Sequence, residues 1–526
     1  MRLPARIALA LASGAAVALA FPPYGLWPLL LVGLLGVVAL LHDLTPRRGA
    51  LVGLAFGLAY MGVLLPWIQV IGPDAWAWLT LLEALFYGVF GWAAALVRPH
   101  RWWPVATPAL WAGVEFARSQ VPFTGFPWGK VAFALADTPL QSYVRYLGVP
   151  ALGALVVALA ALAWWGLLRL REPAHRSPVA AVAAWTGVVA VVAAGSLLPV
   201  GLAGSSGTVR VAAVQGGIPG TGADGLGEQR EVVTNHAQAT ERYAAEVRAG
   251  TADPADVVFW PENSTDIDPL SDAATRTAVE GAVDAVGVPV LVGAVTAGST
   301  PQTVRNVGMV WSPATGPGDI YVKRNLVPFG EYIPLRGLLA PLFSRLDEIP
   351  RDFEAGDEVG VLDLGPVVVA DAMCYDVAFE QVAAPAVAAG AELLVVQTNN
   401  ATYQGTGQPD QQWAISSMRA IETGRDLVVA STNGISGIVE ADGDVLAKST
   451  NDDAIVLTAT VHRADGLTPA VRIGAWLERG LSVAGLIALL VGVGTRAWAR
   501  RRSAGPPPAD AAPSASNPPR EPVRTA

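Results

Sequence analysis

The sequence contains one cysteine among 526 residues, five histidines and only 15% charged residues. A single thiol excludes an intramolecular disulfide and any zinc site built on several thiolates. A net charge of −9 provides no basic face of the kind that nucleic-acid binders need. The one thiol, Cys374, therefore serves either packing or chemistry.

Hydrophobic residues are abundant instead. They make up 52% of the chain, and the mean hydropathy is +0.42, well beyond that of an ordinary soluble domain. Residues 1–203 hold few acidic side chains, whereas most Asp and Glu residues fall between Asp224 and Asp465. This uneven distribution divides the chain into a membrane part and an aqueous part.

A helix needs about 20 apolar residues to cross a bilayer. Such runs occur seven times before residue 204 and once after residue 472. We predict about eight spans: Ile7–Phe21, Leu26–Leu41, Ala50–Ile71, Trp76–Val97, Trp102–Arg118, Leu147–Leu168, Val179–Leu202 and Ile473–Val493. The predicted organisation is an N-terminal transmembrane bundle (1–203), an extracytoplasmic catalytic domain (204–472), a final transmembrane helix (473–495) and a disordered cytoplasmic tail (496–526). Met1–Ala20 also has the features of a secretory signal, but the short Pro22-Pro23 turn before the next span favours its retention.

The orientation follows from the basic residues, because short loops rich in Lys and Arg stay in the cytoplasm. Every second connection between the predicted spans is basic, and Lys130 and Arg145 are the exceptions. We therefore expect both termini in the cytoplasm and the acidic segment outside, in a multi-pass membrane protein. The basic connections contain Arg2, Arg6, Arg47, Arg48, Arg98, Arg101, Arg169, Arg171, Arg176, Arg496, Arg500, Arg501 and Arg502.

From Val209 onward, short β-branched runs alternate with amphipathic stretches. This alternation predicts an α/β domain with helices covering a sheet. The expected strands are Val209–Val214, Asp256–Trp260, Val288–Val295, Val304–Trp311, Ile320–Val322, Val367–Ala370, Leu393–Gln397 and Leu427–Ser431. The expected helices are Glu228–Arg248, Asp272–Val286, Phe379–Ala389 and Pro409–Thr423.

Three side chains that could take part in catalysis follow predicted strands: Glu262, Lys323 and Cys374. Strand ends meet at an edge of a sheet, so these residues are candidates for one site. A thiol needs a base to become a nucleophilic thiolate, and Glu262 is such a base. The Lys323 ammonium is suited to stabilise the thiolate and the oxyanion of a tetrahedral intermediate. Taken singly, each residue also has a structural interpretation: Cys374 as a small core residue, Glu262 as a turn or cap residue and Lys323 as a solvated surface residue.

The flanking segments resemble the nitrilase (carbon-nitrogen hydrolase) superfamily and, more narrowly, the apolipoprotein N-acyltransferase family. The blocks VVFWPENS, YVKRNLVPFGEYIPL and DAMCYDVAFE carry the resemblance, together with 214–216, 419–422, 432–436 and the membrane loop 124–128. The similarity extends from about Phe21 to Val493. It implies a nitrilase-like αββα sandwich attached to a multi-span helical bundle, in a bacterial inner or plasma membrane.

The resemblance also implies a function. An acyl chain would move from a phospholipid, through a thioester on Cys374, to the α-amino group of the diacylglyceryl-cysteine of an apolipoprotein. Glu262 would be the base, Lys323 the oxyanion stabiliser and Glu331 a supporting carboxylate. The family needs no cofactor or metal, and we expect a monomer. Asp376 stands where the family usually has Glu, and residues 399–403 depart from its usual Asn-Asp-Ala-Trp-Phe.

Two other functions remain open from the residues alone. A membrane-tethered amidase or nitrilase would share every catalytic residue, although it would need only one anchoring helix. A transporter or receptor with an outer ligand-binding domain would carry intramembrane ionisable residues, and only Glu83 and Glu115 qualify. The apolar loops 327–329 and 339–343 fit insertion into lipid or packing against the bundle equally well.

Overall fold

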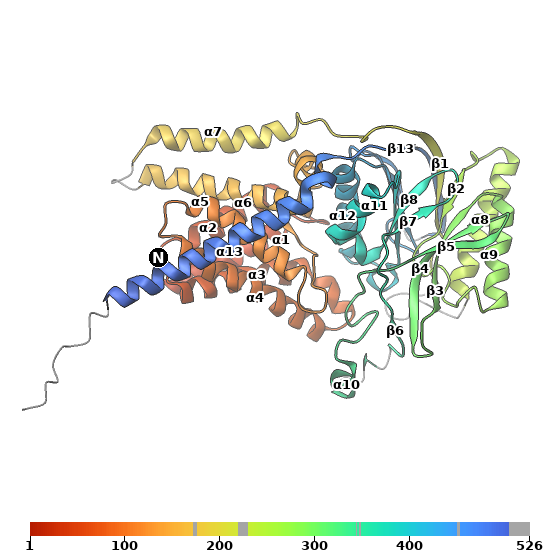
Figure 1. Ribbon diagram of the computed structural model, residues 1–526, viewed down its shortest axis with the longest axis horizontal. Helices are drawn as coiled ribbons and strands as arrows, with labels where there is room; N and C mark the ends of the chain where they lie inside the picture. The colour runs from red at the N-terminus through yellow and green to blue at the C-terminus, as the bar shows by residue number, and fades with distance from the viewer. Residues whose placement is uncertain (172–175, 219–229, 343–344, 347–348, 450–452, 504–526) are drawn as a thin grey trace, which may run out of the picture.

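The computed structural model describes residues 1–526 except 172–175, 219–229, 343–344, 347–348, 450–452 and 504–526. A helical bundle lies at one end and an α/β domain at the other (Figure 1). Each of the eight predicted spans contains a helix. Proline is the first residue of five of them, where its missing N–H costs no hydrogen bond. The helices are α1 (Leu3–Ala18), α2 (Pro28–Leu40), α3 (Pro46–Leu64), α4 (Pro73–Val97), α5 (Trp103–Arg118), α6 (Val144–Arg171), α7 (Pro178–Gly195) and α13 (Pro469–Ser503).

Five helical segments among the described residues are long and apolar enough to cross a membrane, namely 46–64, 73–97, 141–171, 178–195 and 469–502. Helices α1 and α2 are apolar but shorter, with 16 and 13 residues. Eight spans therefore stay a prediction.

The C-terminal boundary of the last span was predicted too early. Helix α13 continues to Ser503, so residues 496–503 are helical rather than part of a disordered tail. Arginines in the last turn favour this extension, because cations stabilise the negative end of a helix dipole. The rest of the predicted tail, 504–526, lies outside the described residues.

Glycines allow α3 and α4 to approach each other closely. A Cβ atom on Gly53 would overlap the backbone oxygen of Tyr87, and one on Gly91 would overlap that of Gly49. Small residues at such crossings bring helix backbones into contact and increase van der Waals packing.

The α/β domain has two facing sheets, as the resemblance to a nitrilase-like αββα sandwich implied, whereas the strand pattern alone indicated only helices covering a sheet. One sheet has the order β13-β1-β2-β3-β4-β5, with β6 paired to β4, and the other has the order β12-β11-β10-β9-β8-β7. Val211, Leu291, Val395 and Val428 belong to the apolar core between them. The strands are β1 (Gly207–Gln215), β2 (Val257–Phe259), β3 (Val290–Ala297), β4 (Thr303–Ser312), β5 (Gly316–Val322), β6 (Asp352–Phe353), β7 (Val361–Asp363), β8 (Val368–Met373), β9 (Leu393–Thr398), β10 (Leu427–Ser431), β11 (Gly437–Val439), β12 (Val445–Lys448) and β13 (Ile455–Arg463).

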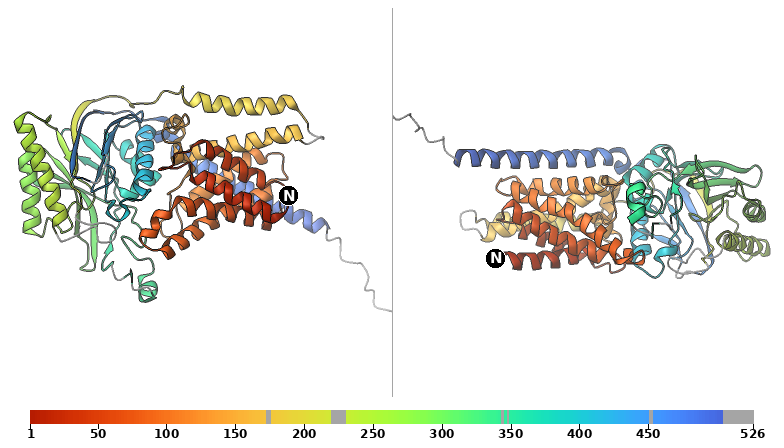
Figure 2. Two further views of the ribbon diagram at one scale, coloured as in Figure 1. Left: turned by 180° about the vertical axis from the view of Figure 1, so that it is seen from behind. Right: turned by 90° about the horizontal axis from the view of Figure 1, so that it is seen from below.

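Helices cover the outer face of each sheet. Helices α8 (Glu231–Ala249) and α9 (Ala273–Val286) pack on the first sheet, at the end of the molecule far from the bundle (Figure 1). The predicted start of α8, Glu228, lies outside the described residues. Helices α11 (Glu380–Ala388) and α12 (Gln408–Thr423) lie between the second sheet and the bundle (Figure 2). One continuous apolar cluster joins bundle residues such as Phe133 to Ile415 and Met418 of α12. The α/β domain is therefore packed onto the bundle through α11 and α12.

Candidate active site

The three predicted site residues follow strands of different sheets. Glu262 comes after β2 and Lys323 after β5 in the first sheet, whereas Cys374 comes directly after β8 in the second. Lys323 Nζ donates to Glu262 Oε1 at 2.8 Å and to Glu331 Oε1 at 2.9 Å. The ammonium is thus held between two carboxylates, and the site forms where the ends of the two sheets face each other.

An asparagine that the sequence did not single out completes this arrangement. Asn306 of β4 donates from Nδ2 to Glu262 Oε1 at 2.7 Å and to Glu331 Oε1 at 3.1 Å. The backbone N–H of Asn399 donates to the other Glu262 oxygen, Oε2, at 3.0 Å. Each carboxylate therefore has a fixed orientation, as a preorganised base requires.

Cys374 occupies a sharp turn. It is the first residue of the 3-10 turn η8 (Cys374–Ala378), it is partly exposed, and its φ is 49°. A side chain other than glycine seldom adopts this left-handed conformation, which costs of order 1–3 kcal/mol and persists where the surroundings enforce it. The turn lies close enough to Glu262 and Lys323 for their charges to act on the thiol.

Burial and charge set the protonation states. Burial, with the Glu262 charge adding to it, raises the pKa of the Cys374 thiol to about 12 against the opposing effect of Lys323. Burial also raises the pKa of Glu262, although Lys323 partly offsets it. Burial alone would lower the pKa of Lys323, but Glu262 and Glu331 hold that pKa well above its usual value. The resting site thus holds a neutral thiol beside an ammonium, and Glu262 has a pKa moved toward that of a working base.

Asp376 lies beside this centre and binds the segment that follows β5. Its Oδ2 accepts from the Tyr321 hydroxyl at 2.8 Å, and its Oδ1 accepts from the Asn325 backbone N–H at 2.8 Å and from Asn325 Nδ2 at 2.7 Å. Asp376 is fully buried. It therefore ties the turn that begins at Cys374 to the residues on either side of Lys323.

A loop from the bundle reaches the same turn. Arg118, at the end of α5, donates from Nη1 to the carbonyl oxygens of Phe126 and Trp128 at 2.8 and 2.9 Å. The Tyr375 hydroxyl donates to Gly125 O at 2.9 Å, and the Tyr375 ring stacks on Trp128. The loop 124–128 is accordingly part of the wall of the site.

The segments that depart from the expected family pattern also border the site. The altered block 399–403 begins with the backbone N–H that binds Glu262 and ends at Tyr403, whose ring meets Trp67 edge-on at 5.2 Å. In the apolar loop 327–329, the Phe329 ring contacts Phe123 with centroids 6.2 Å apart, yet 41% of Phe329 remains exposed. Phe343, at the end of the other apolar loop, lies outside the described residues.

Potential metal ligands gather away from this centre. Asp426, Glu440 and His462 form one such group among the described residues. Asp426 already accepts hydrogen bonds from Ala441 N and His462 N, at 2.8 Å each. Both oxygens of the Asp426 carboxylate thus already bind backbone N–H groups.

Comparisons with known proteins define first a class and then a family. The carbon-nitrogen hydrolase family model matches residues 210–466, and the apolipoprotein N-acyltransferase N-terminal domain model matches residues 13–162. Solved structures include a mutant of the Nesterenkonia AN1 amidase from the nitrilase superfamily, at 19% identity and a TM-score of 0.38, covering 53% of this chain and 99% of that one. The carbon-nitrogen hydrolase model match makes the chain an enzyme of that superfamily.

The curated relatives narrow this class. An apolipoprotein N-acyltransferase from Mycolicibacterium smegmatis is 35% identical over 515 residues, covering 93% of this chain and 85% of the relative. Others from Nitrosomonas europaea and Chromobacterium violaceum are 31% and 30% identical, covering 94% and 95% of this chain and 97% and 96% of theirs. The chain belongs to the apolipoprotein N-acyltransferase family, as the motifs predicted.

Proposed function

We propose that this protein transfers an acyl chain from a phospholipid to the α-amino group of the diacylglyceryl-cysteine of an apolipoprotein, with Cys374 as nucleophile, Glu262 as base and Lys323 as oxyanion stabiliser. The observation that carries the proposal is the Lys323 ammonium bonded to Glu262 and Glu331 beside the only thiol of the chain. Family membership supports the choice of substrates.

The first half-reaction forms a thioester. Glu262 takes the thiol proton, and the Cys374 sulfur attacks the ester carbonyl carbon of the phospholipid. Lys323 donates a hydrogen bond to the oxyanion that develops. As the ester C–O bond breaks, Glu262 returns the proton to the departing glycerol oxygen, so a lysophospholipid leaves and the acyl chain stays on sulfur.

The second half-reaction uses the same groups in the reverse order. The acceptor amine attacks the thioester carbonyl carbon while Glu262 removes a proton from the nitrogen. The C–S bond breaks, and the thiolate regains its proton from Glu262. Lys323 stays protonated throughout, as its two carboxylate partners favour. The reaction is therefore ping-pong, with one covalent intermediate.

The predicted topology suits these substrates. We infer that the catalytic domain lies on the extracytoplasmic face, with both termini in the cytoplasm. Donor and acceptor both have their acyl chains in the membrane, so lateral diffusion would bring them to a domain packed on the bundle. Exposed apolar side chains such as Phe329 and Leu335 are then candidates for contact with lipid.

Incubation with a phospholipid carrying a labelled acyl chain and a synthetic diacylglyceryl lipopeptide tests the function. We expect a lipopeptide that gains one labelled acyl group as an amide, together with one lysophospholipid for each transfer. Labelled free fatty acid without acylated peptide would instead identify a hydrolase. Acyl transfer or lysophospholipid release that does not depend on Cys374 would show that Cys374 is not the nucleophile.

A further inference from the structure

A buried ionic network joins the catalytic domain to the bundle. Lys130, in the bundle loop before α6, donates from Nζ to Glu380 Oε1 of α11 at 3.0 Å and lies 3.7 Å from Glu478 Oε1 of α13. Arg419 of α12 donates from Nη1 to Glu380 Oε2 at 2.9 Å and to Glu422 Oε2 at 2.5 Å. Lys130 and Arg419 are each 1% exposed. Because both charges are buried, removing the partner of either one would strongly destabilise the folded protein.

Arg419 also binds the turn that carries the nucleophile. Its Nε donates to Val377 O at 2.9 Å, and its Nη2 donates to Ala378 O at 3.0 Å. Val377 and Ala378 end the turn η8, which begins at Cys374 in its left-handed conformation. Arg419 therefore fixes one end of the turn whose other end presents the thiol.

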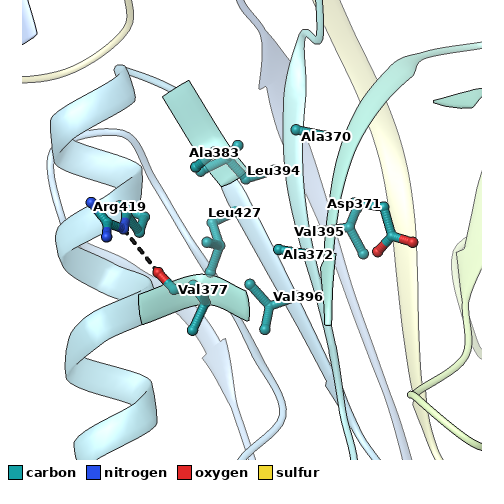
Figure 3. A pocket seen from close by; sticks show the side chains of 10 residues that line it. All are labelled: Ala370, Asp371, Ala372, Val377, Ala383, Leu394, Val395, Val396, Arg419 and Leu427. Atoms are coloured by element: carbon teal, nitrogen blue, oxygen red, sulfur yellow. Dashed lines mark hydrogen bonds between the residues drawn. The ribbon is translucent and has the colours of Figure 1, made fainter. Parts of the chain in front are cut away.

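Packing alone leaves room beneath this turn. A small cavity lies between the second sheet and α12, lined mostly by alanine, valine and leucine side chains (Figure 3). Val377 and Arg419 both line it, and the bond from Arg419 to Val377 O runs at its edge, whereas the Asp371 carboxyl group points away from Arg419 (Figure 3). These apolar side chains make van der Waals contacts but no hydrogen bond that would fix the direction of the backbone. The guanidinium is thus a directional restraint on the turn at that point.

We propose that Arg419 is a positioning residue for Cys374, and that Lys130 of the bundle supports it through their shared partner Glu380. The inference rests on the proposed acyl transfer and adds the bundle to the support of its nucleophile. Burial opposes the ionised form of Glu380, but Arg419 and Lys130 lower its pKa to about 2, so it remains a carboxylate that bonds both cations.

Lysine cannot replace arginine in this role. The planar guanidinium bonds two backbone carbonyls and two carboxylates at once, whereas a single ammonium on a flexible stem cannot reach all four positions. Arg419→Lys keeps the charge and lets the turn move. A displacement of the reacting atom by about 1 Å can cost 10²-fold in rate.

The experiment measures thioester formation on the full-length protein in single turnover, by intact mass after mixing with phospholipid. We expect the acylation rate constant of Arg419→Lys to fall about 10- to 100-fold, with the phospholipid concentration for half-maximal rate unchanged. The matched control is Arg425→Lys, because Arg425 is equally buried and donates to the carbonyls of Ala391 and Gly466 without touching η8. It should acylate at close to the wild-type rate constant.

Other outcomes would overturn the inference. If wild type forms a thioester and Arg419→Lys forms it equally fast, or if both arginine variants lose the same factor, Arg419 does not position the nucleophile. Absence of a thioester on wild type would instead reject the proposed function itself. Should Arg419→Lys not fold, Lys130→Gln decides: a clear fall in the acylation rate constant alone supports the coupling, and a wild-type rate constant rejects it.

Discussion

Replacing Glu262 by Gln separates the role of a base from that of a structural carboxylate. The Gln oxygen can still accept the hydrogen bond from Lys323, but its NH₂ group can occupy the place of the oxygen that accepts from Asn399 N. Because burial and the Glu262 charge raise the pKa of Cys374, the thiol is almost entirely neutral at pH 7. Loss of a positioned base then costs about 10²- to 10⁴-fold in turnover.

The same variant should change thiol reactivity in the opposite direction. Burial is the main cause of the raised pKa of Cys374, and the negative charge of Glu262 adds to it. Removing that charge lowers the pKa, so iodoacetamide should alkylate Cys374 faster in Glu262→Gln than in wild type between pH 7 and 9. Because Cys374 is the only cysteine, intact mass reports this reaction without ambiguity.

Glu354→Gln is the control for this pair of measurements. Glu354 also accepts several hydrogen bonds in the catalytic domain, including one from Arg305 Nε at 2.9 Å, but it takes no part in the site. It should leave turnover and alkylation near wild type. Turnover of Glu262→Gln within a factor of about three of wild type would refute the assignment of the base, whatever the alkylation rate.

Three further predictions concern topology, buried charge and the turn that follows β8. In a Cys374→Ala background, Thr251→Cys should react with an impermeant maleimide on intact cells and Asp43→Cys only after permeabilisation; the reverse pattern would invert the topology. Burial raises the pKa of Asp371 well above its usual value, and neither carboxyl oxygen has a hydrogen-bond partner among the described residues. Only the unfolded state ionises near pH 4, so stability is lost as pH rises from about 4 toward the raised pKa of the folded state. Asp371→Asn does not titrate and should gain about 1–3 kcal/mol in unfolding free energy relative to wild type between pH 5 and 8; a constant difference in thermal denaturation would contradict this. Asp376→Asn turns one accepting oxygen into a donor and should lose about 1–3 kcal/mol of stability in the same assay, whereas an unchanged denaturation temperature would show that those hydrogen bonds contribute little.

The site residues at strand ends were readable from the sequence, and those within strands were not. Glu262, Lys323 and Cys374 each follow a β-branched run, where a polar residue breaks the pattern. Asn306 lies inside β4, and no local signal separates it from any other strand residue. The Lys130 pairing was also hidden, because its partner Glu380 is 250 positions away.

The fold was predicted to a similar degree. Long apolar runs identified a helix in each of eight segments, because a helix that crosses a membrane must be apolar over most of its length. Alternating strands and helices identified the α/β domain, but strand patterns do not record which of two sheets a strand joins. The end of α13 was missed because its last eight residues, 496–503, include four arginines that interrupt the apolar run, although Arg and Ala are good helix formers.

The central claim is that Cys374 carries the acyl chain. Intact-mass measurement of the full-length protein after incubation with phospholipid, before any acceptor is added, tests it most directly. We predict a mass increase equal to one acyl chain in wild type, removed by hydroxylamine and by added lipopeptide, and no such adduct on Cys374→Ala. Acyl transfer to the lipopeptide without this adduct, or transfer that survives in Cys374→Ala, would contradict the mechanism.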